Sequence, residues 1–348
     1  METYEYIFAA VIMVAILIAA IFLTGISPQL YRSTSEIEQL KMAAQKIMAQ
    51  VMLSPGKSMN GVEDWGGDIT IKGSNLSSFG LAVSAFSTRE AFTLDPDKVQ
   101  RLSRELGELY IKPEEALKML NLGSYYGIAL TFIPALNIDV SWAGSDITIE
   151  VLTEQGMPAS NVSIVVGAFH VQDGKVGFNL ARLRDVDGDG RCDVSFPFNP
   201  ELLIVVADYY GIRMVNVTSS SPHRGYFIGR YLLTSSSSII NDALQVFAVS
   251  FPNGTIALMG VTCSLEQWIN APISDYRVYN VSYVEPNAIA VVALTEDNKL
   301  MVAHKIVPTN YSSTASEVYP PLAYMLERSV KIGLSTYTLR LKVWRMSW

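Results

Sequence analysis

The chain of 348 residues has only two cysteines and three histidines, and charged residues make up only 17% of it. Because Cys192 and Cys263 allow at most one intramolecular disulfide, no disulfide framework can hold the fold. The histidines, His170, His223 and His304, have no neighbours at the spacing typical of metal ligands. A Gly-x-Ser-x-Gly elbow, a P-loop and a Gly-x-Gly-x-x-Gly fingerprint are also lacking, so we predict that the protein is not an enzyme.

Basic residues are too few for a nucleic-acid partner. The chain carries 26 basic against 33 acidic residues, for a net charge of −7, and its isoelectric point is near 5.1. Phosphate backbones attract a basic face, which this composition does not supply. We therefore expect no nucleic acid among the partners.

Charge is missing altogether between residues 7 and 23, within an apolar run from Tyr6 to Ile26. At the rise of an α-helix, about 20 apolar residues match a hydrocarbon core of roughly 30 Å. The run therefore predicts a transmembrane helix, with a buried core helix as the alternative. The residues expected to contact the membrane or other subunits are Ile7, Phe8, Val11, Ile12, Val14, Ile16, Leu17, Ile21 and Phe22.

Signals for orientation conflict. Lys and Arg follow the apolar run but do not precede it, which favours an outside N-terminus, yet long domains translocate largely regardless of charge. Six Asn-x-Ser/Thr sequons occur where chance predicts roughly two, as in an exported glycoprotein. We expect a single-span protein of the cell membrane and cell surface with an extracellular C-terminal body. The predicted glycosylation sites are Asn75, Asn161, Asn216, Asn253, Asn280 and Asn310.

A second helix is expected after a break or kink at Ser27-Pro28. Ser33–Glu36 offers N-cap chemistry, and the helix should end near Leu53. Its apolar residues alternate at spacings of three and four, which is typical of a packing seam. This seam either packs only on the chain's own globular domain or also on copies of the same helix. It consists of Ile37, Leu40, Ala44, Ile47 and Val51.

The rest of the chain becomes richer in β patterns towards its C-terminus. Pro96 and Pro113 each predict the start of a short helix, and Pro320-Pro321 predicts another over residues 322–332. Hairpins are expected at Asp173-Gly174, at Asn253-Gly254 and around residues 296–298. Residues 68–72 alternate as a short strand.

These patterns predict an α+β fold, in which a long N-terminal transmembrane and amphipathic helix precedes a small α+β region and mostly-β, Ig-like sandwich domains. The expected divisions are the helix at 1–53, the α+β region at 54–136, the Ig-like sandwich at 137–222 and a C-terminal β-rich domain at 223–348. The second and fourth divisions are alternatively the two halves of one head.

One acidic loop resembles the DxDxDGxxD calcium loops of extracellular proteins. Its carboxylates lie at Asp185, Asp187, Asp189 and Asp193, and Gly190 allows a tight turn. Four converging carboxylates repel one another unless a hard cation neutralises them, which predicts a structural calcium ion. The alternative is an ordinary acidic turn between strands.

The chain also resembles archaeal type IV pilin-like, membrane-anchored surface proteins, over its first third and its extreme C-terminus. The residues that carry the resemblance are Glu5, Pro28, Leu53-Ser-Pro55-Gly56, Asp64-Trp65, Gly80-Leu81-Ala82, Leu94-Asp95-Pro96-Asp97-Lys98, Leu102 and Val343-Trp344-Arg345-Met346. The middle segment resembles Ig-like and carboxypeptidase-regulatory-type modules. One departure is that no Lys or Arg precedes Tyr6 as in a pilin leader, so the start is unusual, the helix is unprocessed, or the chain is an anchored relative.

The resemblance implies a structural or adhesive surface protein that assembles through its N-terminal helix and displays its β domains. Its partners would be the membrane, copies of itself or similar subunits, and a surface glycan or protein ligand. The alternatives are a non-polymerising single-span binding protein and, from another class, an anchored extracellular hydrolase.

Overall fold

The protein is mostly β, with 49% of its residues in strands and 19% in helices. The computed structural model describes residues 2–84, 92–122, 125–221, 223–235, 240, 245–266, 276–282, 284–285, 288–314 and 322–346, and describes side chains from residue 11 onward except at 19–34. The α+β class expected from the sequence is therefore wrong. Helical signals are concentrated near the N-terminus, whereas the many short strands that follow make up most of the ordered structure.

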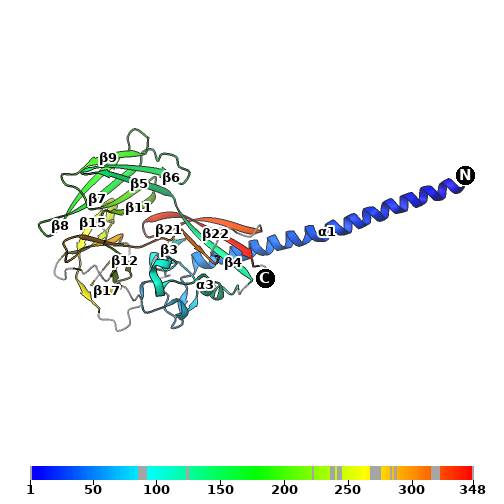
Figure 1. Ribbon diagram of the computed structural model, residues 1–348, viewed down its shortest axis with the longest axis horizontal. Helices are drawn as coiled ribbons and strands as arrows, with labels where there is room; N and C mark the ends of the chain where they lie inside the picture. Colours follow the sequence, from blue (N-terminus) through cyan, green and yellow to red (C-terminus); the bar gives the residue numbers. More distant parts are fainter. Residues whose placement is uncertain are drawn as a thin grey trace.

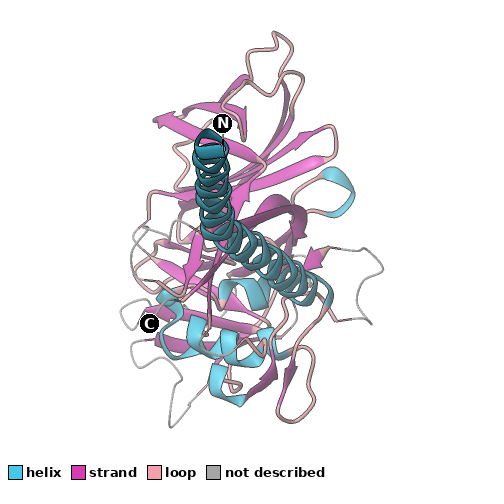
Figure 2. Cartoon of the chain, turned by 90° about the vertical axis from the view of Figure 1, so that its right-hand side faces the viewer, coloured by secondary structure: helices cyan, strands magenta, loops and turns pink. Residues whose placement is uncertain are grey.

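A single long helix, α1 (Glu2–Leu53), leads into a β-rich body. Figure 1 shows α1 projecting from one side of the body, and in Figure 2 it runs towards the viewer from that side. At 1.5 Å per residue its 52 residues span about 78 Å. The expected break at Ser27-Pro28 is wrong, since Pro28 lies inside the helix.

Over the part of the chain whose side chains are described, no helix is both long enough and apolar enough to cross a membrane. This finding overturns the expected transmembrane helix and single-span anchor. It likewise overturns the cell-membrane and cell-surface location and the pilin-like build.

The base of α1 packs on a five-stranded sheet that joins distant parts of the chain. The strand order is β20-β4-β22-β21-β3, and α1 lies against β21 and β22. The strands are β3 (Thr93–Leu94), β4 (Tyr126–Pro134), β20 (Asn310–Ser312), β21 (Ala323–Ile332) and β22 (Ser335–Arg345). Segments from residues 93–134 and from residues 310–345 thus share one sheet, which we call the head sheet.

Short elements surround the base of α1 beside the head sheet. A two-stranded ribbon pairs β1 (Lys57–Ser58) with β2 (Leu76–Ser78). The helices are α2 (Pro96–Gln100) and α3 (Pro113–Met119), with 3-10 turns η1 (Trp65–Gly67), η2 (Gly73–Asn75) and η3 (Arg104–Leu109). Both predicted helix starts, at Pro96 and Pro113, are confirmed.

Residues 323–332 form the strand β21, where a helix over residues 322–332 was expected. β21 pairs with β22 along its whole length, from Ala323 opposite Trp344 to Ile332 opposite Ser335. The Pro-Pro pair resembled a helix start, but the ten backbone pairs of this hairpin override that local preference. Residues 68–72 form turns rather than the expected strand.

A β-sandwich follows the head sheet's β4 directly. A three-stranded sheet, β5-β6-β9, faces a four-stranded sheet, β11-β10-β7-β8, across one apolar core. Such a sandwich is compatible with an Ig-like module. The strands are β5 (Leu136–Ala143), β6 (Asp146–Thr153), β7 (Ser163–Gln172), β8 (Lys175–Arg184), β9 (Arg191–Ser195), β10 (Leu202–Tyr209) and β11 (Ile212–Ser219).

A third layer, an eight-stranded sheet, covers the outer face of β7 and β10. The strand order is β15-β14-β18-β19-β12-β13-β17-β16, with β12 and β19 parallel. A second apolar core fills the space between this sheet and the sandwich. The strands are β12 (Arg224–Ile228), β13 (Tyr231–Ser235), β14 (Val246–Ser250), β15 (Ala257–Gly260), β16 (Cys263–Leu265), β17 (Tyr276–Val281), β18 (Ala290–Leu294) and β19 (Leu300–His304).

Burial on both faces explains the composition of β7 and β10. Their central residues, Ile164–Phe169 and Leu202–Ala207, are buried without alternation and almost all apolar. A strand with one solvated face would alternate apolar and polar residues. The three predicted hairpins are confirmed at the β7–β8, β14–β15 and β18–β19 connections.

Candidate functional site

The projecting part of α1 exposes apolar side chains over its described segment, Val11–Ile18. All seven large ones are 45–66% exposed. They follow one another in sequence, so they point in every direction around the helix axis rather than along one stripe. Among the residues that the structure describes, nothing covers them. They are Val11, Ile12, Met13, Val14, Ile16, Leu17 and Ile18.

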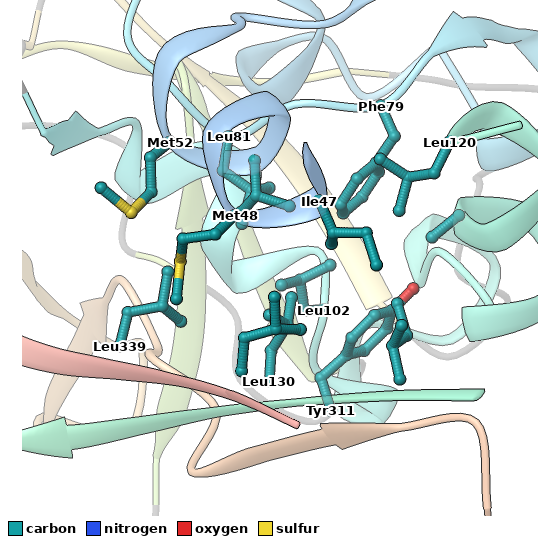
Figure 3. Close-up of a cluster of buried hydrophobic side chains, with 14 of the residues drawn as sticks. Ile47, Met48, Met52, Phe79, Leu81, Leu102, Leu120, Leu130, Tyr311 and Leu339 are labelled. Carbon is teal, nitrogen blue, oxygen red and sulfur yellow. The ribbon is translucent and has the colours of Figure 1, made fainter. Parts of the chain in front are cut away.

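The base of the same helix is buried in the body. Figure 3 shows Ile47, Met48 and Met52 among side chains from the head sheet and its neighbours. Of the predicted seam, Leu40, Ala44, Ile47 and Val51 are at most 3% exposed, whereas Ile37 is 43% exposed. The body therefore accounts for the seam, apart from its first residue. The side chains of Ile7, Phe8, Ile21 and Phe22 lie outside the described residues.

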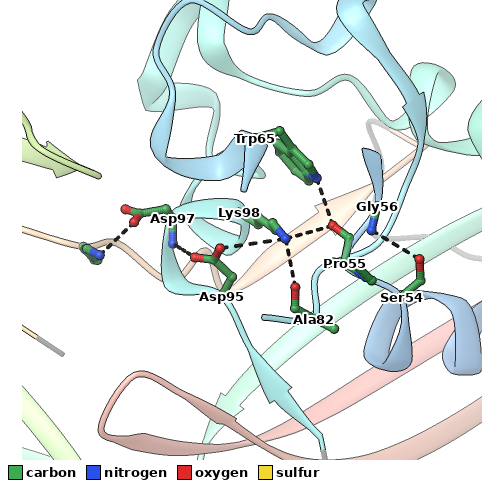
Figure 4. A network of polar contacts seen from close by, with 9 residues as sticks. Ser54, Pro55, Gly56, Trp65, Ala82, Asp95, Asp97 and Lys98 are labelled. Atoms are coloured by element: carbon green, nitrogen blue, oxygen red, sulfur yellow. Dashed lines mark hydrogen bonds and ion pairs between the residues drawn. The ribbon is translucent and has the colours of Figure 1, made fainter. Parts of the chain in front are cut away.

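A buried polar network fixes the end of α1 to the body (Figure 4). The carbonyl oxygen of Pro55 accepts hydrogen bonds from Trp65 Nε1 at 3.0 Å and from Lys98 Nζ at 2.8 Å. Lys98 also donates to the Ala82 carbonyl at 2.9 Å and lies 3.9 Å from Asp95 Oδ2. One fully buried ammonium thus joins three segments of the chain. We call this cluster the anchor network.

Burial dominates the electrostatics of the anchor network. It raises the pKa of Asp95 to about 6, an effect reinforced by Asp97, and lowers the pKa of Lys98 below its usual value. Burial also lowers the pKa of Arg101 to about 10, and its guanidinium donates to the carbonyls of Ile71 and Asp68. Charges held away from water in this way need their partners, so each contact in the network is costly to remove.

Close backbone packing accompanies the network. A Cβ on Gly80 would lie 2.2 Å from the Ser54 carbonyl oxygen, so only glycine fits where this segment crosses the end of α1. Six of the residues in which the sequence resembles pilin-like surface proteins lie together here. They are Pro55, Trp65, Gly80, Ala82, Asp95 and Lys98. Their distances along the sequence carry no spacing signal, so sequence reasoning did not predict the contacts.

In the acidic loop, Asp185 serves as a hydrogen-bond acceptor for the backbone. The side chain is 2% exposed, and it accepts from the N–H groups of Gly188, Asn161 and Gly190 at 2.9, 3.0 and 3.3 Å. These donors stabilise the carboxylate without a cation. Asp185 therefore organises the β8–β9 loop through its own backbone contacts.

The other three acidic residues of the loop do not join Asp185. Asp187, Asp189 and Asp193 are exposed, and Asp193 accepts from the Thr148 hydroxyl on β6 at 2.6 Å. Within the described part of the chain, no group of three or more His, Cys, Asp or Glu side chains is arranged to hold a metal ion. The predicted calcium ion therefore stays a sequence prediction.

The six predicted glycosylation sites differ in how their amides are used. Asn75, Asn161, Asn253 and Asn310 are exposed. Asn216 Nδ2 instead donates to the Ile138 carbonyl at 2.6 Å, and Asn280 Nδ2 donates to Glu266 Oε1 at 2.8 Å. Since a glycan attaches at Nδ2, the last two sites are the less accessible ones.

Histidines and cysteines lie apart in the body. His170 stacks on Phe198 with ring centroids 3.7 Å apart, and His223 Nε2 lies 3.1 Å from Asp297 Oδ2. A hydrogen bond from Thr295, assisted by His223, lowers the pKa of Asp297 to about 2. Cys192 and Cys263 are not joined to each other, and burial raises the pKa of the Cys192 thiol to about 11.

Neither a family model nor a curated protein matches this chain. The resemblances drawn from its sequence therefore stay predictions, and function has to be argued from the geometry. Two features are available for that argument: the exposed segment of α1 and the network that anchors its base.

Proposed function

We propose that this protein is a structural subunit that assembles through α1, with its β-rich body displayed on the outside of the assembly. In the assembly, the exposed surface of α1 is covered by α1 of other copies of the chain. The observation that supports the proposal is the exposure of seven large apolar side chains within Val11–Ile18, on a helix that leaves the body.

The free energy available for assembly is substantial. Complete burial of a large apolar side chain contributes about 1.5–3 kcal/mol, so seven such residues supply on the order of 10 kcal/mol per helix. This is comparable with the stability of a whole domain, about 5–15 kcal/mol.

The distribution of these residues around α1 favours a bundle over a pair. A two-stranded coiled coil buries one narrow seam and leaves the opposite face polar. The described segment from Val11 to Ile18 has no polar residue on any side. Several helices packed around one another satisfy this pattern, and copies of the chain supply identical helices.

Two methionines on α1 provide a matched experiment. Met13 is 66% exposed in the projecting part, and Met42 is 63% exposed on the part that packs on the body. A lysine at Met13 places a charge within the proposed bundle, whereas a lysine at Met42 stays at the body surface. We expect sedimentation velocity and electron microscopy to show assemblies of the wild type and of Met42→Lys, and single chains of Met13→Lys.

Each variant should keep the circular dichroism spectrum of the wild type, because both positions are exposed in the isolated chain. A wild-type protein that sediments as a monomer across the micromolar range contradicts the proposal. So does a Met13→Lys variant that assembles as the wild type does.

A further inference from the structure

The strand β8 forms a long, open edge of the sandwich. It is the last strand in the order β11-β10-β7-β8, and within the described residues it pairs with no strand except β7. The pairing runs from Lys175 opposite Gln172 to Arg184 opposite Ser163. Figure 1 shows β8 on the side of the body away from α1, so an assembly held together by α1 leaves this edge accessible.

Every second residue of β8 directs its backbone N–H and C=O groups away from β7. In an antiparallel pair, residues that bond to the partner strand alternate with residues that do not. The N–H of Val176 donates to Oε1 of Gln245 at 2.7 Å, so Val176 belongs to the second set. By the same alternation Phe178, Leu180 and Arg182 point their backbone groups outward, and in the part of the chain that the structure describes these groups have no backbone partner. An extended chain laid along β8 supplies such partners.

The charge of this edge is positive. Lys175, Arg182 and Arg184 are exposed, and β8 contains no acidic residue. Basic residues on an edge strand oppose pairing with the same strand of a second copy, which would bring like charges together. They attract an acidic strand instead. Asp173 and Asp187, exposed just beyond the two ends of β8, confine this attraction to the strand itself.

The two faces of β8 define which side chains an added strand needs. Arg182 and Arg184 share one face with Leu180, which is 40% exposed, because side chains alternate along a strand. Ala181 and Leu183 lie on the other face and pack against the sandwich core. A strand added beside β8 continues both faces. Acidic residues at every second position therefore meet the arginines, and apolar residues between them extend the core.

We propose that β8 binds an extended acidic segment of a partner protein, which adds a strand to the sandwich and alternates Asp or Glu with β-branched residues. The outward backbone groups of residues 178–182 hold the segment, and the guanidinium groups of Arg182 and Arg184 select its acidic side chains. The site is remote from the exposed segment of α1, so it stands whether or not the chain assembles.

The probe is a fluorescein-labelled peptide, Thr-Glu-Val-Glu-Val-Glu-Thr, titrated with the full chain. Fluorescence anisotropy should show saturable binding with one site per chain. The Kd should rise when NaCl is raised from about 50 to about 500 mM, because salt screens the exposed charges. The same peptide with lysine in place of each glutamate should not bind.

Two variants of β8 test the two parts of the proposal. Leu180→Pro removes an outward N–H and leaves the bonds to β7, so it should keep the fold and raise the Kd at least about 10-fold. The double variant Arg182→Glu, Arg184→Glu should lose the glutamate peptide and gain binding of the lysine peptide. Its matched control is Arg104→Glu, Lys118→Glu, which makes the same change of net charge at exposed positions outside the sandwich and should leave the Kd unchanged.

Absence of saturable binding to the wild type overturns the proposal, as does an unchanged Kd in folded Leu180→Pro. Equal effects of the two charge reversals also overturn it, because they would show attraction to the whole chain rather than to β8. If circular dichroism shows that Leu180→Pro does not fold, the two charge reversals decide. Wild-type dimers that ignore the peptide and dissociate in Leu180→Pro would make a second copy the occupant, against the proposal.

Discussion

The two ends of α1 use the same kinds of residue in opposite environments. Ile16 is 63% exposed and Ile47 is 1% exposed, while Met13 is 66% and Met48 is 4% exposed. All four lie on one continuous helix. The type of a single residue therefore does not separate the projecting part from the packed part. What separates them is whether the body supplies a partner surface.

The order of polar and apolar residues along α1 distinguishes the projecting part from the packed part better than the type of any single residue does. Between residues 40 and 52 the buried positions follow a stripe, and Lys41, Gln45 and Lys46 face solvent. Between residues 11 and 18 there is no polar position at all. A stripe is satisfied by one neighbouring layer, whereas a helix that is apolar all round needs partners on every side. The body of this chain supplies the one layer that the packed stripe needs. We propose that assembly supplies the partners that the projecting segment needs on every side.

The anchor network gives the largest expected effect on the packed end. Lys98→Met removes the buried ammonium but keeps a side chain of similar length, which leaves the Pro55 and Ala82 carbonyls without this donor and the Asp95 carboxylate without its nearby cation. Breaking a buried ion pair in this way costs about 3–5 kcal/mol. We expect the free energy of unfolding at pH 7, measured by urea denaturation, to fall by that amount.

Lys72→Met is the control for this substitution. Lys72 pairs with Glu108 at 2.5 Å, but both side chains are about half exposed. An exposed pair contributes at most about 1 kcal/mol. Equal losses for the two lysine variants would mean that the network does not hold the base of α1.

A pair of isoleucine truncations compares the two ends of α1 directly. Ile47→Ala opens a cavity in a closed core and should lower the free energy of unfolding by about 2–5 kcal/mol. Ile16→Ala removes exposed methyl groups and should change the unfolding of the unassembled chain by no more than about 0.5 kcal/mol. Urea denaturation at submicromolar protein concentration measures both. A large loss for Ile16→Ala at that concentration would show that the body covers the projecting segment.

Local structure was predictable wherever a short-range rule decides it. Pro96 occupies the first turn of α2, as expected from the sequence, and Asp95 caps the helix by accepting from the Asp97 N–H. The two-residue turn at Asp173-Gly174 joins β7 and β8 because both residues adopt the positive φ values that such turns require. In each case the residues that determine the structure are neighbours in the chain.

Errors arose where distant residues decide the structure. β21 is a strand because β22 pairs with all of it, and no pattern within residues 322–332 reports that partner. The same holds for the anchor network, whose Pro55, Ala82 and Lys98 lie on three separated segments.

The pH dependence of stability sharpens the comparison further, because titration at the packed end involves a buried carboxylate. The pKa of Asp95 is about 6 in the folded chain and near 3.8 when unfolded, so between these values the folded state binds more protons. The stabilising contribution of the protonated group is thus complete below about pH 4 and lost as pH rises through 6, a difference of at most about 3 kcal/mol.

Asp95→Asn keeps an oxygen to cap α2 but does not titrate. In urea denaturation at pH 4 to 7, the difference in unfolding free energy between wild type and Asp95→Asn should therefore change across this range. If it stays constant, Asp95 titrates as an exposed carboxylate does, and the anchor network is open to water.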